Sequence, residues 1–370
     1  MKILNLLATG MAGGIETLCN NIDKYSNEDN YWVFLFLKGE IADKMIKRNP
    51  SKVFYLGYNK MRFFKYVDFL NKMIKEKNIE VVSIHHGGTY CNVLFYILKK
   101  LNKDVKFVRF LHSCYEDEFS LKHKFFEDIL YLRYLNKALQ CSDMIISVSN
   151  AVQESYEKKF NLKNKKKKVI YNGIGNEFYE KKQQTRKHMN NRPLELIYVG
   201  RLVGVKGVDI LIKAVSVLCK KKYSAKLTIV GDGKERQKYK ELVENLNLQE
   251  KVSFVGVQTN VIKWLDKSDL FVYPSICKEA FGISVVEAMA RGCVPIVSNR
   301  GGLTEIVEDG KTGYIFKNKD IMDLVNKILQ YISLKDKDEI SNRSIEKSKT
   351  FRINNTIDSI NEAYKEIVEK

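Results

Sequence analysis

The sequence predicts an α/β protein made of two doubly wound, Rossmann-like domains, each with a parallel sheet. Two observations predict this fold class. Short apolar or β-branched runs alternate with longer helix-period segments along nearly the whole chain, and a polar stretch at 176–192 interrupts that alternation. Such alternation is typical of repeated βαβ units. A chain of 370 residues is also long enough for more than one hydrophobic core.

The first domain is expected over residues 1–178. Its predicted strands lie at 3–8, 32–37, 53–56, 81–84, 105–111, 144–149 and 169–171, with helical segments between them. One of those segments, 60–77, mixes Lys and Arg with an apolar stripe and predicts a basic amphipathic helix. A helix of that kind ordinarily covers a sheet, although it can also lie on an anionic membrane.

The second domain is expected over residues 179–350. Pro193 precedes a predicted strand at 194–199, and further strands are predicted at 227–230, 252–255, 270–273 and 294–298. The last segment carries apolar residues at three- and four-residue spacing over 353–368, which predicts an amphipathic helix. Ligands of doubly wound sheets bind outside the carboxyl ends of the strands, so two such domains facing each other would form one interdomain cleft.

Composition narrows the classes of partner and compartment. The formal charge of +19 favours anionic partners, although lysine-rich soluble surfaces show the same excess, and no motif that reads nucleic acid accompanies it. Seven scattered cysteines without a C-x-x-C pair favour a reducing cytoplasm and no zinc site. We expect neither a spanning helix, because no apolar run approaches about 18 residues, nor a signal peptide at 1–15.

The loop at 9–16 contains Gly10, Gly13 and Gly14 between a predicted strand and a predicted helix. Glycine lets the backbone approach a ligand closely, and a helix N-terminus attracts phosphate. The loop lacks the G-x-G-x-x-G spacing, so a nicotinamide dinucleotide site is not supported. The segment G-R-L-V-G-V-K-G at 200–207 is more informative, because Arg201 and Lys206 can converge on one diphosphate.

The most informative segment is C-K-E-A-F-G-I-S-V-V-E-A-M-A at 277–290. Glu279 precedes a small loop that contains Gly282, and Glu287 lies in the apolar helix that follows. A carboxylate among apolar residues needs a hydrogen-bonding partner, which the hydroxyl groups of a ligand would supply. The amides of 281–283, at a helix start, would also suit an anion or a sugar hydroxyl.

These motifs, together with G-G-L-T-E-I-V-E-D-G-K-T-G-Y-I-F at 301–316, resemble glycosyltransferase family 4, the group 1 glycosyl transferases, over essentially the whole chain. The resemblance implies the GT-B fold, with a helix at 351–370 that packs back on the first domain. It implies a retaining transferase that moves a sugar from a nucleotide-diphosphate donor, most often a UDP-sugar, to an acceptor hydroxyl. Neither a metal nor another cofactor is implied.

The resemblance also implies roles for individual residues. His112 would lie near the transferred sugar, Arg201 and Lys206 would bind the diphosphate, and Glu279 would contact the sugar hydroxyls. These four are the catalytic candidates. The donor-binding candidates, among which Glu287 would hold the ribose, are Gly13, Gly14, Gly200, Phe281, Gly282, Ile283 and Glu287.

Without the resemblance, His112 would be interpreted as an ordinary hydrogen-bonded histidine at a strand end, and the resemblance favours the functional role. The acidic residues at 116–118 would raise its pKa if they folded back. His85 and His86 are acceptor-side candidates, and Asn172-Gly173 is interpreted as a structural turn. The D-x-D triplet at 336–338 follows no strand and is not expected to hold a metal.

The implied acceptor is a saccharide or a lipid-linked saccharide, in the assembly of a bacterial exopolysaccharide, capsule or other cell-surface glycan. We expect a cytoplasmic protein that can contact the inner face of an anionic plasma membrane, and no nucleic-acid partner. Two alternatives stay open. One is another GT-B enzyme, either a phosphorylase or a nucleotide-sugar epimerase, and the other is a non-catalytic protein that binds sugar nucleotides or membranes.

Overall fold

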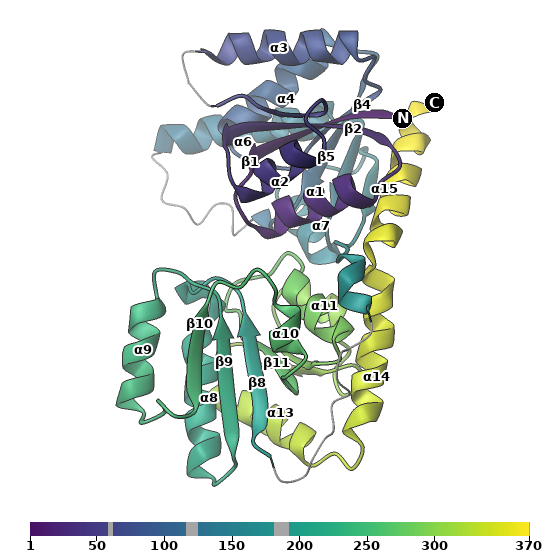
Figure 1. The fold of residues 1–370 in the computed structure, drawn as a ribbon. Helices are drawn as coiled ribbons and strands as arrows, with labels where there is room; N and C mark the ends of the chain where they lie inside the picture. Colours follow the sequence, from purple (N-terminus) through teal and green to yellow (C-terminus); the bar gives the residue numbers. More distant parts are fainter. Residues whose placement is uncertain (58–61, 116–124, 181–191, 370) are drawn as a thin grey trace. The chain divides into compact units, whose positions relative to one another are not determined.

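The computed structural model describes residues 1–57, 62–115, 125–180 and 192–369 (Figure 1). The chain divides into two compact units. Unit 1 comprises Met1–Gly173 and Ile353–Lys370, and unit 2 comprises Ile174–Arg352. The expected domain limits were 1–178, 179–350 and 351–370.

Unit 1 contains a seven-stranded, wholly parallel sheet in the order β3-β2-β1-β4-β5-β6-β7. Each strand expected in this half of the chain is present, with its ends moved by a few residues. The strands are β1 Lys2–Thr9, β2 Asp29–Leu37, β3 Val53–Tyr55, β4 Val81–Ile84, β5 Lys106–Leu111, β6 Met144–Ser147 and β7 Lys167–Val169.

Helices cover both faces of this sheet, which is why its strands are apolar at successive positions. Ile3 and Leu7 of β1 belong to one core, whereas Leu4 and Leu6 belong to the core on the opposite face. The helices are α1 Gly14–Tyr25, α2 Glu40–Arg48, α3 Phe63–Glu76, α4 Thr89–Leu101, α6 Phe125–Cys141, α7 Asn150–Glu157 and α15 Ile353–Val368.

Two of these helices test expectations from the sequence. The basic amphipathic segment forms α3, which buries Val67, Leu70 and Ile74, while Phe64 stays 75% exposed. Helix α15 forms over the predicted residues, and its apolar face joins the core that contains Ile3. The turn before unit 2 packs closely on α15, because a Cβ at Gly173 would lie 2.5 Å from the Cα of Ile353.

Unit 2 contains a six-stranded parallel sheet in the order β10-β9-β8-β11-β12-β13. Its strands are β8 Leu194–Val199, β9 Ala225–Val230, β10 Val252–Gly256, β11 Leu270–Tyr273, β12 Val294–Ser298 and β13 Tyr314–Phe316. The three-residue strand β13 was not predicted from the sequence. It pairs with β12 at the edge of the sheet.

The helices of unit 2 are α8 Val208–Lys220, α9 Arg236–Asn245, α10 Ile262–Leu265, α11 Ile283–Ala290, α12 Leu303–Ile306, α13 Ile321–Ile332 and α14 Lys337–Ser348, with 3₁₀ turns at η2 Asn176–Tyr179, η3 Gly204–Lys206 and η4 Lys349–Phe351. Among the described residues of both units, no helix is both long and apolar enough to cross a membrane.

The strand order reverses once in each sheet, between β1 and β4 in unit 1 and between β8 and β11 in unit 2. At such a switch point the loops that follow the two neighbouring strands leave in opposite directions, and ligands bind between them. The glycine-rich loops at 9–16 and 200–207 both leave a central strand at this point. The fold therefore places the candidate residues at the expected edge of each sheet.

Candidate active site

The centre of the site in unit 2 is an ion pair between Lys206 and Glu279. Lys206 Nζ lies 2.5 Å from Glu279 Oε1 and 3.1 Å from the Tyr273 hydroxyl, and its side chain is largely buried. Burial alone would lower the pKa of Lys206, but the charges of Tyr273 and Glu279 and the hydrogen bonds with both outweigh burial, so the pKa is raised. Lys206 therefore supplies a fixed positive charge.

Local backbone geometry explains how Lys206 comes to lie there. It ends the turn η3, and Gly207 follows with φ +66 before α8 begins. A Cβ at Gly207 would lie 2.2 Å from the carbonyl oxygen of Pro274, so only glycine lets the two chain segments approach this closely. The motif G-R-L-V-G-V-K-G thus brings its lysine against the residues that follow β11.

Glu279 is held by both its side chain and its backbone. Its Oε1 accepts hydrogen bonds from Lys206 and from the Ser275 hydroxyl. Its carbonyl oxygen accepts from the amide of Gly302 at 2.7 Å, and Gly301, at φ +60, lies too close to the Glu279 backbone to carry a side chain. The G-G of the third motif therefore fixes the carboxylate's position.

Among the described residues, no hydrogen bond or ion pair joins Arg201 to this pair. Arg201 is exposed, and its guanidinium donates no hydrogen bond to any residue that the structure describes. Its carbonyl oxygen accepts from the Tyr198 hydroxyl at 3.0 Å. Gly200 before it is constrained, because a Cβ there would lie 2.7 Å from that hydroxyl oxygen. The predicted convergence of Arg201 and Lys206 on one ligand stays a prediction.

The loop 281–283 opens α11. Gly282 occupies the N-cap with φ +116, and no side chain caps the helix. The amides of Gly282 and Ile283 precede the first hydrogen bond within the helix, so they are available to a ligand. Phe281 is buried and packs edge-on against Phe351, with 5.4 Å between the ring centroids, which anchors the loop.

Glu287 lies one turn further along α11. Burial raises its pKa, and the carboxylate of Glu177 in η2 raises it further, to about 7. Burial favours the protonated form of a carboxylic acid, and a second negative charge nearby does the same. A raised pKa of this kind indicates a carboxyl group whose partners are incomplete, as the sequence suggested.

In unit 1 the glycine-rich loop is built around Glu16, which sequence reasoning did not single out. Gly13 is the N-cap of α1, Gly14 is its first residue, and a Cβ at Gly13 would lie 2.5 Å from Glu16 Oε2. Glu16 Oε1 accepts from Thr9 Oγ1 at 2.5 Å and lies 3.4 Å from His86 Nε2. Burial raises the pKa of Glu16, but these hydrogen bonds outweigh it and lower the pKa.

His112 follows β5 directly, and its Nε2 lies 3.2 Å from Nδ1 of His85, which follows β4. Burial, together with the nearby charges of His85, His86 and Arg109, lowers the pKa of His112 well below its usual value. This direction is opposite to the effect expected from the acidic residues at 116–118, which lie outside the described residues. His112 is therefore neutral at physiological pH.

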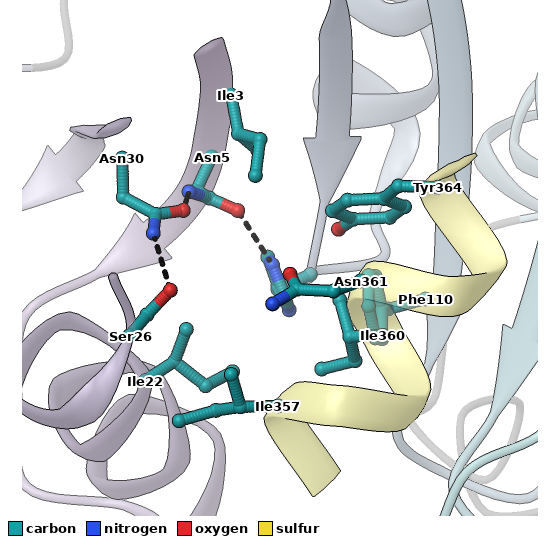
Figure 2. Close-up of a pocket in the computed structure, with 11 residues that line it drawn as sticks. Ile3, Asn5, Ile22, Ser26, Asn30, Phe110, Ile357, Ile360, Asn361 and Tyr364 are labelled. Atoms are coloured by element: carbon teal, nitrogen blue, oxygen red, sulfur yellow. Dashed lines mark hydrogen bonds between the residues drawn. The ribbon is translucent and has the colours of Figure 1, made fainter. Parts of the chain in front are cut away.

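Figure 2 shows a small cavity in unit 1 that is lined in part by residues of α15. Asn5, Asn30, His85, Asn361 and Tyr364 line it, together with Ser26 and apolar side chains. It has room for about one water molecule. It is thus a buried polar pocket within unit 1 and is too small for a sugar.

The D-x-D triplet caps a helix. Asp336 accepts from the amides of Asp338 and Glu339, at 2.9 and 3.1 Å, and begins α14. Across residues 1–57, 62–115, 125–180 and 192–369, no three His, Cys, Asp or Glu side chains gather as a metal site.

Sequence reasoning missed Ser275 and Tyr273 as well as Glu16. Tyr273 ends the buried strand β11, and Ser275 follows it by two residues, so their place at the carboxyl end of a central strand was the available signal. Cys277 belongs to the same cluster, with its Sγ 3.7 Å from Glu279 Oε1. Thr9 ends β1 and Glu16 lies in the first turn of α1, so these two residues lie on either side of the glycine-rich loop.

Comparison with known proteins identifies the family of this chain. The family model for group 1 glycosyl transferases matches residues 179–351, and the model for glycosyltransferase family 4 matches residues 12–178. The N-acetyl-alpha-D-glucosaminyl L-malate synthase of Bacillus anthracis is 26% identical over 331 residues, which are 84% of this chain and 81% of that protein.

Two solved structures share the whole fold. The complex of HepE from Anabaena with UDP-glucose has a TM-score of 0.81 at 20% identity and covers 98% of this chain and 99% of its own. A glycosyltransferase from Rickettsia africae has a TM-score of 0.82 at 20% identity and covers 100% and 99%. The two family models and these folds agree: the chain belongs to glycosyltransferase family 4, the group 1 glycosyl transferases, and is an enzyme of the two-domain GT-B fold.

Proposed function

We propose that this enzyme is a retaining glycosyltransferase that moves a sugar from a UDP-sugar to an acceptor hydroxyl. The observation that carries the proposal is the buried pair of Lys206 and Glu279 beside the uncapped N-terminus of α11. This arrangement offers a cation and backbone amides for a diphosphate and a carboxylate for sugar hydroxyls within one small area. The UDP-glucose bound in the Anabaena structure of the same fold supports the choice of donor.

Each group has a defined part in the proposed reaction. Lys206, Arg201 and the amides of Gly282 and Ile283 stabilise the negative charge that grows on the departing diphosphate. Glu279 accepts hydrogen bonds from the sugar, which orients its anomeric carbon toward the acceptor. The acceptor oxygen forms its bond on the face from which the diphosphate leaves, and its proton passes to a phosphate oxygen of the leaving group.

The remaining donor contacts that we propose are those that the family resemblance implies. Glu287 accepts from the ribose hydroxyls, and the backbone at Gly13 and Gly14 lets the donor approach unit 1. His112 contacts the transferred sugar. Because lysine and arginine supply the positive charge, we expect turnover without a divalent metal and without another cofactor.

The acceptor proposed is a saccharide or lipid-linked saccharide at the cytoplasmic face of the membrane, in the assembly of a cell-surface glycan. Helix α3 supports this setting, because exposed Phe64 and Phe69 lie among exposed Lys65, Lys72 and Lys75. Sedimentation with anionic vesicles at low salt tests it. Binding that is absent with neutral vesicles and is lost in Lys65→Glu supports the contact, and equal sedimentation with both vesicle types contradicts it.

The donor reaction is tested with a panel of UDP-, GDP- and ADP-sugars, with and without a chelator. We expect one UDP-sugar to raise the melting temperature and to be consumed, and proton NMR to show that the product keeps the donor's anomeric configuration. Lys206→Ala should abolish both effects. Lys213→Ala is the matched control, because Lys213 pairs on the surface of α8 in the same unit.

Two outcomes would contradict the proposal. Folded enzyme that neither binds nor consumes any UDP-sugar would exclude the donor. A product of inverted configuration would exclude the retaining course while leaving the donor site in place. The two results therefore separate donor recognition from stereochemistry.

A further inference from the structure

The histidines after β4 and β5 end a chain of hydrogen bonds whose protons can be assigned one by one. Asn5 Nδ2 donates to Asn30 Oδ1 at 3.0 Å, as Figure 2 shows, so Asn5 Oδ1 faces the other way. Ser83 Oγ donates to Asn5 Oδ1 at 2.6 Å. A serine hydroxyl has one proton, so the Ser83 oxygen can only accept from its other neighbours.

The proton of His85 is fixed by these two residues. His85 Nε2 lies 3.2 Å from Ser83 Oγ and 3.5 Å from Asn5 Oδ1, and both atoms act as acceptors there. Nε2 must therefore carry the proton. Burial, with the nearby charges of His86 and Arg109, lowers the pKa of His85 to about 3, so the ring is neutral and its Nδ1 is bare.

The bare Nδ1 of His85 in turn fixes His112. It lies 3.2 Å from His112 Nε2 and can only accept, so His112 carries its proton on Nε2. His112 is neutral as well, which leaves its own Nδ1 without a proton. Within the described part of the chain, that Nδ1 is buried and has no hydrogen-bond partner.

Stacking keeps both rings in these orientations. Phe110 stacks on His85 with 4.3 Å between centroids and on His112 with 5.7 Å. A 180° flip of the His85 ring would place Cδ2 against His112 Nε2 and Cε1 against Ser83 Oγ, so both hydrogen bonds would be lost. Stacking therefore fixes the ring planes, and the hydrogen bonds fix the ring orientation and the tautomers.

We infer that His85 is a positioning residue, held by Ser83 and Asn5, that fixes His112 as a hydrogen-bond acceptor for one hydroxyl of the transferred sugar. The inference rests on the proposed function, in which His112 contacts that sugar. A bare ring nitrogen attracts an O–H group and repels a fluorine or a carboxylate at the same position. The donor sugar must therefore carry a free hydroxyl there, and His112 neither donates to the diphosphate nor protonates it.

Nitrogen NMR of the histidine side chains tests the tautomers without any substrate. The chain has five histidines, so single substitutions assign the signals. We expect His85 and His112 to show a protonated Nε2 and a bare Nδ1. His85→Leu should leave His112 as a mixture of tautomers, and His86→Asn, the control from the neighbouring position, should leave it unchanged. A protonated Nδ1 on His112 in the unsubstituted enzyme would overturn the inference.

Kinetics with UDP-sugars that lack one hydroxyl, or carry fluorine in its place, tests the consequence. One position should raise KM by about 3- to 10-fold on either change, the cost of one neutral hydrogen bond, with a smaller effect on kcat. In His112→Ala that sensitivity should disappear. His85→Leu should weaken it, and His85→Asn, whose amide oxygen can accept where Nδ1 did, should restore it.

Failure of the inference is distinguishable from failure of the proposed function. Turnover whose hydroxyl preference is the same in His85→Leu as in the unsubstituted enzyme contradicts the inference alone. No turnover with any UDP-sugar contradicts the proposed function, while the tautomers remain measurable. If His85→Leu does not fold, Ser83→Ala removes the nearer acceptor of the His85 proton with less change in volume, and it should shift His112 part of the way toward that mixture.

Discussion

Replacing Glu287 with glutamine should make the ligand-free enzyme more stable and the donor complex weaker. The pKa of Glu287 is raised from 4.5 to about 7, so folding at alkaline pH places an ionised carboxylate in surroundings that disfavour it. At about 1.36 kcal/mol per pKa unit, that cost is about 3 kcal/mol. Glutamine has nearly the same shape and no charge, so Glu287→Gln removes the cost.

The sign of the pH dependence follows from the two pKa values. The raised pKa costs nothing below about 4.5, where the carboxyl group is protonated in both states, and the cost grows until about 7. The gain from Glu287→Gln should therefore be about 3 kcal/mol at pH 8 and about 1 kcal/mol at pH 5. UDP should stabilise the variant less than the unsubstituted enzyme, because a ribose contact is lost.

Urea unfolding of unit 2, followed by tryptophan fluorescence, measures this change in stability. The chain has two tryptophans, and a Trp32→Phe background leaves Trp264, which lies in α10 of unit 2, as the reporter. Glu244→Gln on α9, an exposed glutamate of the same unit, is the control and should change stability little at either pH. Equal stability of Glu287→Gln and its parent at pH 8, or a gain that does not depend on pH, would refute the reasoning.

Three further outcomes are expected. Gly282→Ala should lower the free energy of unfolding in urea by about 1–3 kcal/mol and weaken UDP binding. The reason is that φ is +116 at this position and the new Cβ would lie 2.7 Å from Leu303 Cδ2. Unchanged UDP affinity would contradict this prediction. Arg109→Met should stabilise unit 1 by about 1–4 kcal/mol, because Arg109 is 1% exposed and its Nε and Nη1 have no partner among the described residues. A loss of stability in urea unfolding would contradict this expectation. Unit 1 should lose stability as pH falls below about 6.5, because the unfolded state binds a proton at His85 before the folded state does. The loss is up to about 1.4 kcal/mol per pH unit for His85 alone. In urea unfolding at pH 7 and pH 5, His85→Asn should reduce this dependence on pH.

The sequence predicted the strands well because parallel strands covered on both faces are apolar at successive positions, which is a strong local signal. Helix α15 was predictable to its ends for a related reason, since its apolar positions repeat over four turns. The edge strand β13 was not predicted, although its three residues are apolar like those of the other strands. Its position depends on pairing with β12, which is a tertiary contact.

The contacts of the site were less predictable than its residues. Lys206 and Glu279 were both named from motifs, but their direct pairing depends on β8 and β11 being neighbours, and the strand order is not written in local sequence. The same holds for His85 and His112, which were considered separately and meet because β4 lies beside β5. Tertiary proximity, not residue type, is the information that the sequence lacked.

The return of α15 to unit 1 determines the order in which the protein can be completed during synthesis. Every residue of unit 2 leaves the ribosome before Ile353, so unit 2 can finish folding while α1 and α2 cover only part of one apolar face of the first sheet. The part of that face that α15 covers, which includes Ile3, stays exposed until α15 has been synthesised. During that interval the exposed apolar surface makes the chain more prone to aggregation than the finished fold is, and a chaperone is most needed then.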